Sequence, residues 1–235
     1  MVDPTPSVVV LAGPNGAGKS TSARAIVRKA LGVDEFVNAD ILAQGLSGFE
    51  PGRAAMAAGR IMLARLRELA RQRRSFAFET TLASRSFAPR IAEWIATGYR
   101  FHLVFLGLPD PGMAVARVAA RVEEGGHHVP EETIRRRFEA GLRHFDRLYR
   151  RMATAWGFWD NSTESGLVPI ASGEGTPAGL RASPSSWRDA TAIEQAQRRA
   201  ISEAIDRKRR LGDPAVIWRE GKIVWIPAGE IGRSS

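Results

Sequence analysis

Short apolar runs alternate with amphipathic stretches along most of the chain. The β-branched run 7–12 ends at Gly13 and predicts a buried parallel strand. Shorter apolar runs predict further strands at 36–38, 76–78, 101–106, 158–159 and 167–170. Because helical stretches separate these runs, the order predicts an α/β fold with an open, mostly parallel sheet and helices on both faces.

Helical spacing is clearest in 52–74, where apolar residues recur every three or four positions. Similar spacing predicts helices at 19–31 and 87–97, and a helix that follows the strand 101–106 and continues through Glu124. A further helix is expected to begin at Pro130, a residue that suits the first helical position, and to continue to about residue 153.

The C-terminal part of the chain has a different composition. Residues 171–187 are rich in Gly, Ser, Pro and Ala and predict a loop or linker. The segment 188–235 begins with a predicted helix and contains a predicted hairpin of 215–219 with 222–226. Since this tail is too small for an independent domain, we expect it to pack on a core formed by 1–170.

Overall composition indicates a folded globular protein, because 44% of the residues are hydrophobic and 25% are charged. The chain contains no cysteine, which excludes disulfides, thiol nucleophiles and Cys-ligated metals and suits a reducing cytoplasm. Its apolar runs are far shorter than the about 20 residues of a membrane helix, and its N-terminus lacks a signal pattern. We therefore expect a cytoplasmic protein with no membrane contact.

The formal net charge of +9 favours anionic partners, from nucleotide phosphates to nucleic acid. The arginines are scattered over predicted helices and do not form a basic tail. This distribution favours a solvated basic surface over a nucleic-acid footprint. Nucleic acid is therefore not the expected partner.

The segment after the first strand matches the phosphate-binding pattern G-x-x-x-x-G-K-[ST] at every fixed position. Its residues are Gly13, Pro14, Asn15, Gly16, Ala17, Gly18, Lys19 and Ser20, and Thr21 follows. The glycines let backbone N–H groups surround phosphate oxygens at the positive end of the next helix. Lys19 would reach the β- and γ-phosphates, and the Ser20 hydroxyl would ligate magnesium. The sequence therefore predicts a site for ATP and Mg²⁺.

Polar residues follow several predicted strands at the sheet edge that lines the ligand crevice in such folds. Asp40, just past the second strand, could orient an acceptor hydroxyl and take its proton, or it could cap a helix. Glu79, at the end of the third strand, could hold magnesium, contact the substrate or serve as a structural cap. Residues 160–162 could line a base pocket or form an Asx-type turn.

A double-glycine loop between two basic helices predicts a hinged lid around 111–140. Arg117 and Arg121 lie one turn apart, so both point to the same side of the first helix. Closure would bring such arginines over the phosphates, and a solvated basic helix face is the alternative. We expect His127 and His128 to lie in the hinge or at the substrate, not to bind a metal.

Several motifs resemble, in the same order, the zeta-toxin family, in the branch described as predicted ABC-type ATPases. They cover about 7–162 and read VVVLAGPNGAGKST, VNAD, FAFETTL, GYRFHLVFLGL, ARVAARVEEGGHHVPEETIRRRF and WDNS. The resemblance implies a P-loop nucleotide-kinase-like fold and ATP-dependent phosphorylation of a hydroxyl group on a small metabolite. Zeta toxins modify a sugar hydroxyl of uridine diphosphate N-acetylglucosamine, so a nucleotide sugar substrate, a toxin role and an antitoxin partner are implied as well.

The resemblance also implies roles for individual residues. Phosphate transfer is assigned to Asp40 as the base, with Lys19, Arg117 and Arg121 around the phosphates. Contacts to the substrate or to magnesium are assigned to Glu79 and Thr80, and His128 is expected at the substrate from its place in the double-glycine loop. A further contact to ATP is assigned to Arg136, in the basic turn of the lid.

Two departures from the family pattern concern the acceptor and leave ATP binding unaffected. The helix before the third strand is apolar around Arg60, where better-known zeta toxins carry an acidic substrate contact. Histidines 127 and 128 stand where their lid has an arginine. The alternative function is a nucleic-acid-associated ATPase or a polynucleotide kinase that uses the arginine surface, which would bind with a steep salt dependence.

Overall fold

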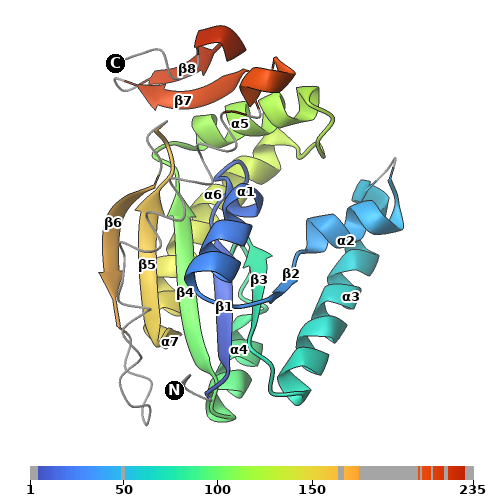
Figure 1. Ribbon diagram of the computed structural model, residues 1–235. Helices are drawn as coiled ribbons and strands as arrows, with labels where there is room; N and C mark the ends of the chain where they lie inside the picture. Colours follow the sequence, from blue (N-terminus) through green and yellow to red (C-terminus); the bar gives the residue numbers. More distant parts are fainter. Residues whose placement is uncertain are drawn as a thin grey trace.

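The central sheet has six strands in the order β2-β3-β1-β4-β5-β6 (Figure 1). The computed structural model describes residues 5–48, 51–163, 167–174, 206, 208–212, 214–219 and 222–230. The strands are β1 (Ser7–Ala12), β2 (Glu35–Val37), β3 (Phe76–Thr80), β4 (Arg100–Gly107), β5 (Ala155–Asp160) and β6 (Val168–Gly173). All neighbours are parallel except β6, which is antiparallel to β5 at the edge. The predicted α/β fold with a mostly parallel sheet is confirmed.

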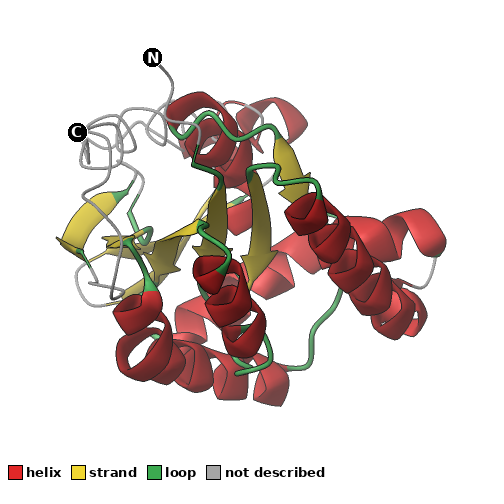
Figure 2. Cartoon of the chain, turned by 90° about the horizontal axis from the view of Figure 1, so that it is seen from below, coloured by secondary structure: helices red, strands yellow, loops and turns green. Residues whose placement is uncertain are grey.

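Helices cover both faces of the sheet, as the view from below shows (Figure 2). They are α1 (Lys19–Ala23), η1 (Arg24–Ala30), α2 (Ala39–Leu46), α3 (Pro51–Arg71), α4 (Ala88–Ala96), α5 (Pro111–Glu123), α6 (Glu131–His144), η2 (Phe145–Tyr149) and α7 (Arg150–Met152). The segments η1 and η2 are π-helical continuations of α1 and α6. None of the helices in the described ranges combines the length and the apolar composition that a membrane span requires.

The core lies in two layers because side chains of β1 alternate between the two faces of the sheet. Val9 and Leu11 pack in one buried cluster with residues of η1, α5 and α6. Val8 and Val10 pack in the other, with residues of α3, α4 and η2. This central strand, buried on both sides, fixes the position of the loop that follows it.

The predicted C-terminal hairpin consists of β7 (Ala215–Arg219) and β8 (Lys222–Ile226), paired antiparallel and followed by η4 (Ala228–Glu230). The hairpin lies against α5 (Figure 1). Residues 206 and 208–211 are helical, as expected. The predicted loop 171–187 is wrong at its start, because β6 pairs with β5 through Gly173. The remainder of the predicted helix and of the loop after residue 174 lies outside the described residues.

Candidate active site

The loop between β1 and α1 adopts a conformation that only glycine fits at two of its positions. Gly13 has φ +144°, and a Cβ atom there would lie 2.2 Å from the carbonyl oxygen of Leu106. Gly18 has φ +77°, and its Cβ would lie 2.6 Å from Nδ2 of Asn161. The pattern read from the sequence therefore corresponds to a real steric requirement at these positions.

Lys19 begins α1 and is buried, with 6% of its surface exposed. Its Nζ donates a hydrogen bond to the carbonyl oxygen of Pro14 at 2.8 Å and lies 3.8 Å from Oε1 of Glu79. Burial lowers the pKa of Lys19, and the carboxylates of Glu79 and Asp40 oppose this shift. The ammonium group thus lies between the glycine loop and two acidic side chains.

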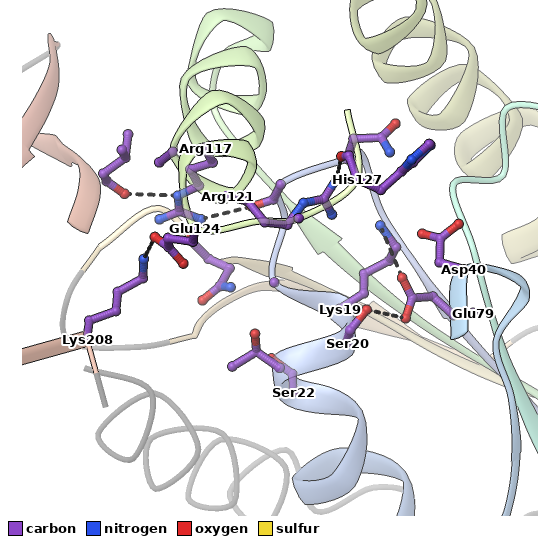
Figure 3. Close-up of a pocket in the computed structure, with 18 of the residues that line it drawn as sticks. Lys19, Ser20, Ser22, Asp40, Glu79, Arg117, Arg121, Glu124, His127 and Lys208 are labelled. Atoms are coloured by element: carbon purple, nitrogen blue, oxygen red, sulfur yellow. Dashed lines mark hydrogen bonds and ion pairs between the residues drawn. The ribbon is translucent and has the colours of Figure 1, made fainter. Parts of the chain in front are cut away.

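Glu79 connects the glycine loop to the second strand (Figure 3). The Ser20 hydroxyl donates to Oε2 of Glu79 at 2.9 Å, and Nδ2 of Asn38 donates to the same oxygen at 2.7 Å. The side-chain oxygen of Asn38 accepts the backbone N–H groups of Asp40 and Ile41, at 2.7 and 3.2 Å. Asn38 therefore caps α2 and orients Glu79.

Asp40 lies in the first turn of α2, so it is not the helix cap that the sequence left open as an alternative. Its side chain is exposed and lines the same cavity as Lys19 and Glu79. The sequence analysis missed the capping residue, Asn38. Its capping preference was readable in the sequence, but its contact with Glu79 depends on the pairing of β2 with β3.

Arg117 on α5 is half-buried, and its guanidinium group donates only to backbone carbonyl oxygens among the described residues. Its acceptors are Val216 (3.0 Å), Gly16 (3.4 Å), Asn161 (2.7 Å) and Ser162 (3.2 Å). Burial lowers the pKa of Arg117 to about 10. The side chain joins the glycine loop, the end of β5 and β7, a geometry that favours a positioning role over direct phosphate contact.

Arg121, one turn further along α5, lines the cavity. One of its terminal nitrogens donates to the carbonyl oxygen of His127 at 2.8 Å. Its Nε is buried and has no hydrogen-bond partner among the described residues. Its positive charge contributes to the lowered pKa of Lys19. Arg121 therefore adds a positive charge to the cavity wall near Lys19.

Neither Arg136 nor Arg137 of α6 lines the cavity. Arg137 is half-buried and its charge makes the smallest named contribution to the lowered pKa of Lys19, whereas Arg136 is exposed. His127 lines the cavity, and His128 is exposed outside it. The Thr80 hydroxyl accepts the N–H of Leu82 at 3.1 Å in a turn, again outside the cavity wall. Three predicted contacts, Arg136, His128 and Thr80, are thus not brought to the cavity.

The segment after β5 forms the Asx-type turn that the sequence offered as one alternative. The Asp160 carboxylate accepts the N–H and the hydroxyl of Ser162, each at 2.9 Å. Nδ2 of Asn161 donates to the carbonyl oxygen of Ala17 at 2.9 Å, which supports the glycine loop. Asn161 and Thr163 also line the cavity, so this segment serves both as a turn and as a cavity wall.

The cavity has a volume of about 450 Å³, within the range of small-molecule sites. Its walls come from the glycine loop, α2, α5 and the C-terminal segment. The residues that sequence analysis did not single out are Ser22, Asn38, Ile41, Gln44, Ala120, Glu124, Thr163, Lys208, Ala215, Val216 and Ile217. Nothing local in the sequence places the C-terminal residues there, because their position depends on contacts with α5.

Comparisons with other proteins agree with this fold. The chain is 29% identical over 126 residues to an uncharacterized protein of Haemophilus influenzae, covering 54% of this chain and 88% of that protein. A chain of the PezAT toxin–antitoxin system of Streptococcus pneumoniae superposes with a TM-score of 0.57 and 13% identity, covering 88% of both chains. A chain of the AvrRxo1-ORF1:ORF2 complex with ATP gives 0.52 and 15%, covering 72% of this chain and 58% of that one.

The strongest assignment comes from a family model that spans the glycine loop, both site carboxylates and the helices α5 and α6. The model is AAA_33, described as an AAA domain, and it matches residues 8–148. Since this match covers more than half of the sequence, the chain belongs to the AAA domain family AAA_33.

Proposed function

We propose that the protein is an ATP-dependent kinase that transfers the γ-phosphate to a hydroxyl group of a small metabolite. The observation that carries the proposal is the juxtaposition of Lys19, Glu79 and Asp40 at one cavity. A glycine loop alone supports nucleotide binding, whereas a free carboxylate beside the phosphate-binding lysine supports transfer to an alcohol. The fold likeness to the AvrRxo1 complex with ATP is consistent with this nucleotide.

The phosphate end of the site would use the loop N–H groups, Lys19 and the guanidinium charge of Arg121, which lines the cavity. Arg137 would add a positive charge from the second lid helix. The Ser20 hydroxyl and the Glu79 carboxylate are adjacent oxygen donors of the kind that Mg²⁺ prefers, so these two residues would hold it. A bound Mg²⁺ would neutralise negative charge on the phosphates.

Asp40 would act as the general base. Its carboxylate accepts the proton of the acceptor hydroxyl as that oxygen bonds to the γ-phosphorus. The bond from the γ-phosphorus to the β–γ bridging oxygen breaks, and ADP leaves. Lys19 and Arg121 stabilise the charge that develops on the transferred group and on ADP. The proton then passes from Asp40 to solvent.

The acceptor would lie on the α2 side of the cavity, where Asp40, Ile41, Gln44 and His127 contribute to the wall. Hydrogen-bonding groups beside an apolar side chain suit a hydroxylated metabolite of modest size. We propose a nucleotide sugar of the uridine diphosphate N-acetylglucosamine type, on the strength of the zeta-toxin resemblance.

The decisive experiment incubates the protein with γ-labelled ATP, Mg²⁺ and a panel of nucleotide sugars, nucleosides, dinucleotides and RNA. Mass spectrometry then identifies the species that gains one phosphate. We expect a small-molecule product with the wild type, and none with Asp40→Asn or Lys19→Ala. ATP binding should persist in Asp40→Asn and be lost in Lys19→Ala. Label released only as inorganic phosphate, or found only on RNA ends, would overturn the proposed acceptor class.

The toxin role belongs to the same proposal and is supported by the zeta-toxin resemblance and by the fold likeness to the PezAT chain. Induced expression in a bacterial host should arrest growth, and Asp40→Asn should remove the effect because it removes transfer. An antitoxin would then be sought as a partner that restores growth. Equal growth inhibition by the wild type and by Asp40→Asn would contradict a toxic kinase activity.

A further inference from the structure

The cavity has two chemically different ends. In Figure 3, Asp40 and Glu79 lie on one side of Lys19, and Arg117, Glu124 and Lys208 lie on the other. The first end carries the phosphate-binding lysine and the acids. The second end is walled by Ala215, Val216 and Ile217 of β7, which are 8%, 7% and 6% exposed. Three consecutive apolar residues thus line the second end, whereas the first end contributes Ile41 beside charged and polar side chains.

The C-terminal segment that includes Lys208 and the β7–β8 hairpin contacts α5 at three places along the helix. Near the start of α5, a Cβ on Gly112 would lie 3.4 Å from Cδ1 of Ile223 in β8. In the middle, Nε of Arg117 donates to the carbonyl oxygen of Val216 at 3.0 Å. At its end, Nζ of Lys208 pairs with the Glu124 carboxylate and donates to the carbonyl oxygen of Pro214 at 3.1 Å.

These contacts hold β7 in a defined position next to the glycine loop. Lys208 bridges Glu124 to Pro214, the residue directly before β7, and thereby fixes where the strand begins. Arg117 bridges β7 to Gly16 of the glycine loop. The wall is therefore part of the same structural unit as the phosphate site.

We propose that β7 forms the wall against which the base of the bound nucleoside triphosphate lies, with Lys208 as the positioning residue that holds the wall in place. The inference rests on the proposed function, because it takes the triphosphate to bind at the glycine loop. A base has apolar faces and polar edges. The β7 side chains would cover a face, and Asn161 and Thr163 lie on the same cavity for the edges.

The test separates the base from the phosphates by comparing ATP with inorganic tripolyphosphate, both with Mg²⁺, in calorimetric titrations. Because successive residues of a strand point to opposite faces, one variant is made on each face of β7, Val216→Asp and Ile217→Asp. We expect at least one of them to weaken ATP binding about tenfold or more while leaving tripolyphosphate binding unchanged. The matched control is Trp225→Ala, on β8 and outside the cavity wall, which should leave both affinities unchanged.

A second test uses Lys208→Glu, which leaves the sequence of β7 unchanged. It should weaken ATP binding selectively, and adding Glu124→Lys should restore the affinity by re-forming the ion pair with reversed charges. Unchanged ATP affinity in Lys208→Glu and in both β7 variants would overturn the inference. Equal loss of ATP and tripolyphosphate would also overturn it, since the tail would then support the loop and not the base. Failure of the wild type to bind either ligand would instead refute the proposed function.

Discussion

The Glu79 carboxylate interacts with three side chains, those of Lys19, Ser20 and Asn38. Substitution of Asn38 is the most informative of the three, because Asn38 also caps α2. Asn38→Ala removes a hydrogen bond to Glu79 and the cap of α2 together. We expect kcat to fall about tenfold or more, since Glu79 and Asp40 both lose their support. The loss of the cap should cost about 1 kcal/mol in the free energy of unfolding.

The control for this variant is Asn38→Ser, which keeps a capping oxygen but lacks an amide that reaches Glu79. It should lower kcat like Asn38→Ala while retaining most of the stability. Steady-state kinetics with the identified acceptor and urea unfolding measure the two effects. Full activity in Asn38→Ser would show that Asn38 acts only as a helix cap.

Two neighbouring arginines of α6 form a matched pair. Arg137→Gln should weaken kcat/KM for ATP about tenfold or more, because the positive charge near Lys19 is lost. Arg136→Gln should leave kcat/KM unchanged, because Arg136 is exposed and, unlike Arg137, is not among the charges that shift the pKa of Lys19. The opposite ranking in a kinetic comparison would assign the ATP contact to Arg136, as first expected from the sequence.

Arg136 and Arg137 show why the residues of the candidate active site could be predicted only in part from the sequence. Successive residues on a helix point about 100° apart, so the run 135–137 does not reveal which arginine faces the phosphates. The same holds for His127 and His128 in their loop. The glycine loop, Asp40 and Glu79 were recognisable because each lies at or just past the carboxyl end of a strand, and that position directs it to the crevice.

At the scale of elements, β4 carries a buried histidine that makes stability depend on pH. His102 is 1% exposed, and burial, with a smaller contribution from Arg100, lowers its pKa to about 3. The folded chain therefore keeps His102 neutral, whereas the unfolded chain protonates it near its ordinary value of 6.5. Between these two values the unfolded state binds more protons, so stability is lost as the pH falls.

His102→Gln removes this titration. Its free energy of unfolding should therefore decrease less than that of the wild type between pH 7 and pH 4.5, as measured by urea denaturation at several pH values across this window. Parallel pH profiles for the two proteins would contradict the buried neutral state of His102.

The elements themselves were largely predictable because their signals are local. Apolar runs marked β1, β3 and β4, and the helix expected at 130–153 corresponds to α6, η2 and α7. The strand at 76–78 extends to Thr80, because Glu79 and Thr80 pair with Leu11 and Ala12 of β1. The docking of β7 on α5 was expected only in outline, since it joins residues as distant as Arg117 and Val216.

At the scale of the whole molecule, the net charge of +9 raises the question of nucleic acid. Exposed arginines such as Arg135 and Arg136 fit the solvated basic surface expected from the sequence. We expect no retention on single- or double-stranded DNA or RNA at low salt, where electrostatic binding is strongest. A steep salt dependence together with labelling of polynucleotide ends would support the polynucleotide kinase alternative.

In the proposed mechanism, one cavity holds a triphosphate tail at the glycine loop and an acid that receives the acceptor's proton. A crystal structure with a non-hydrolysable ATP analogue and Mg²⁺ would show both parts at once. We expect the γ-phosphate within hydrogen-bond distance of Lys19, with the Asp40 carboxylate facing its open side. An empty glycine loop, or an Asp40 side chain directed away from the γ-phosphate, would contradict it.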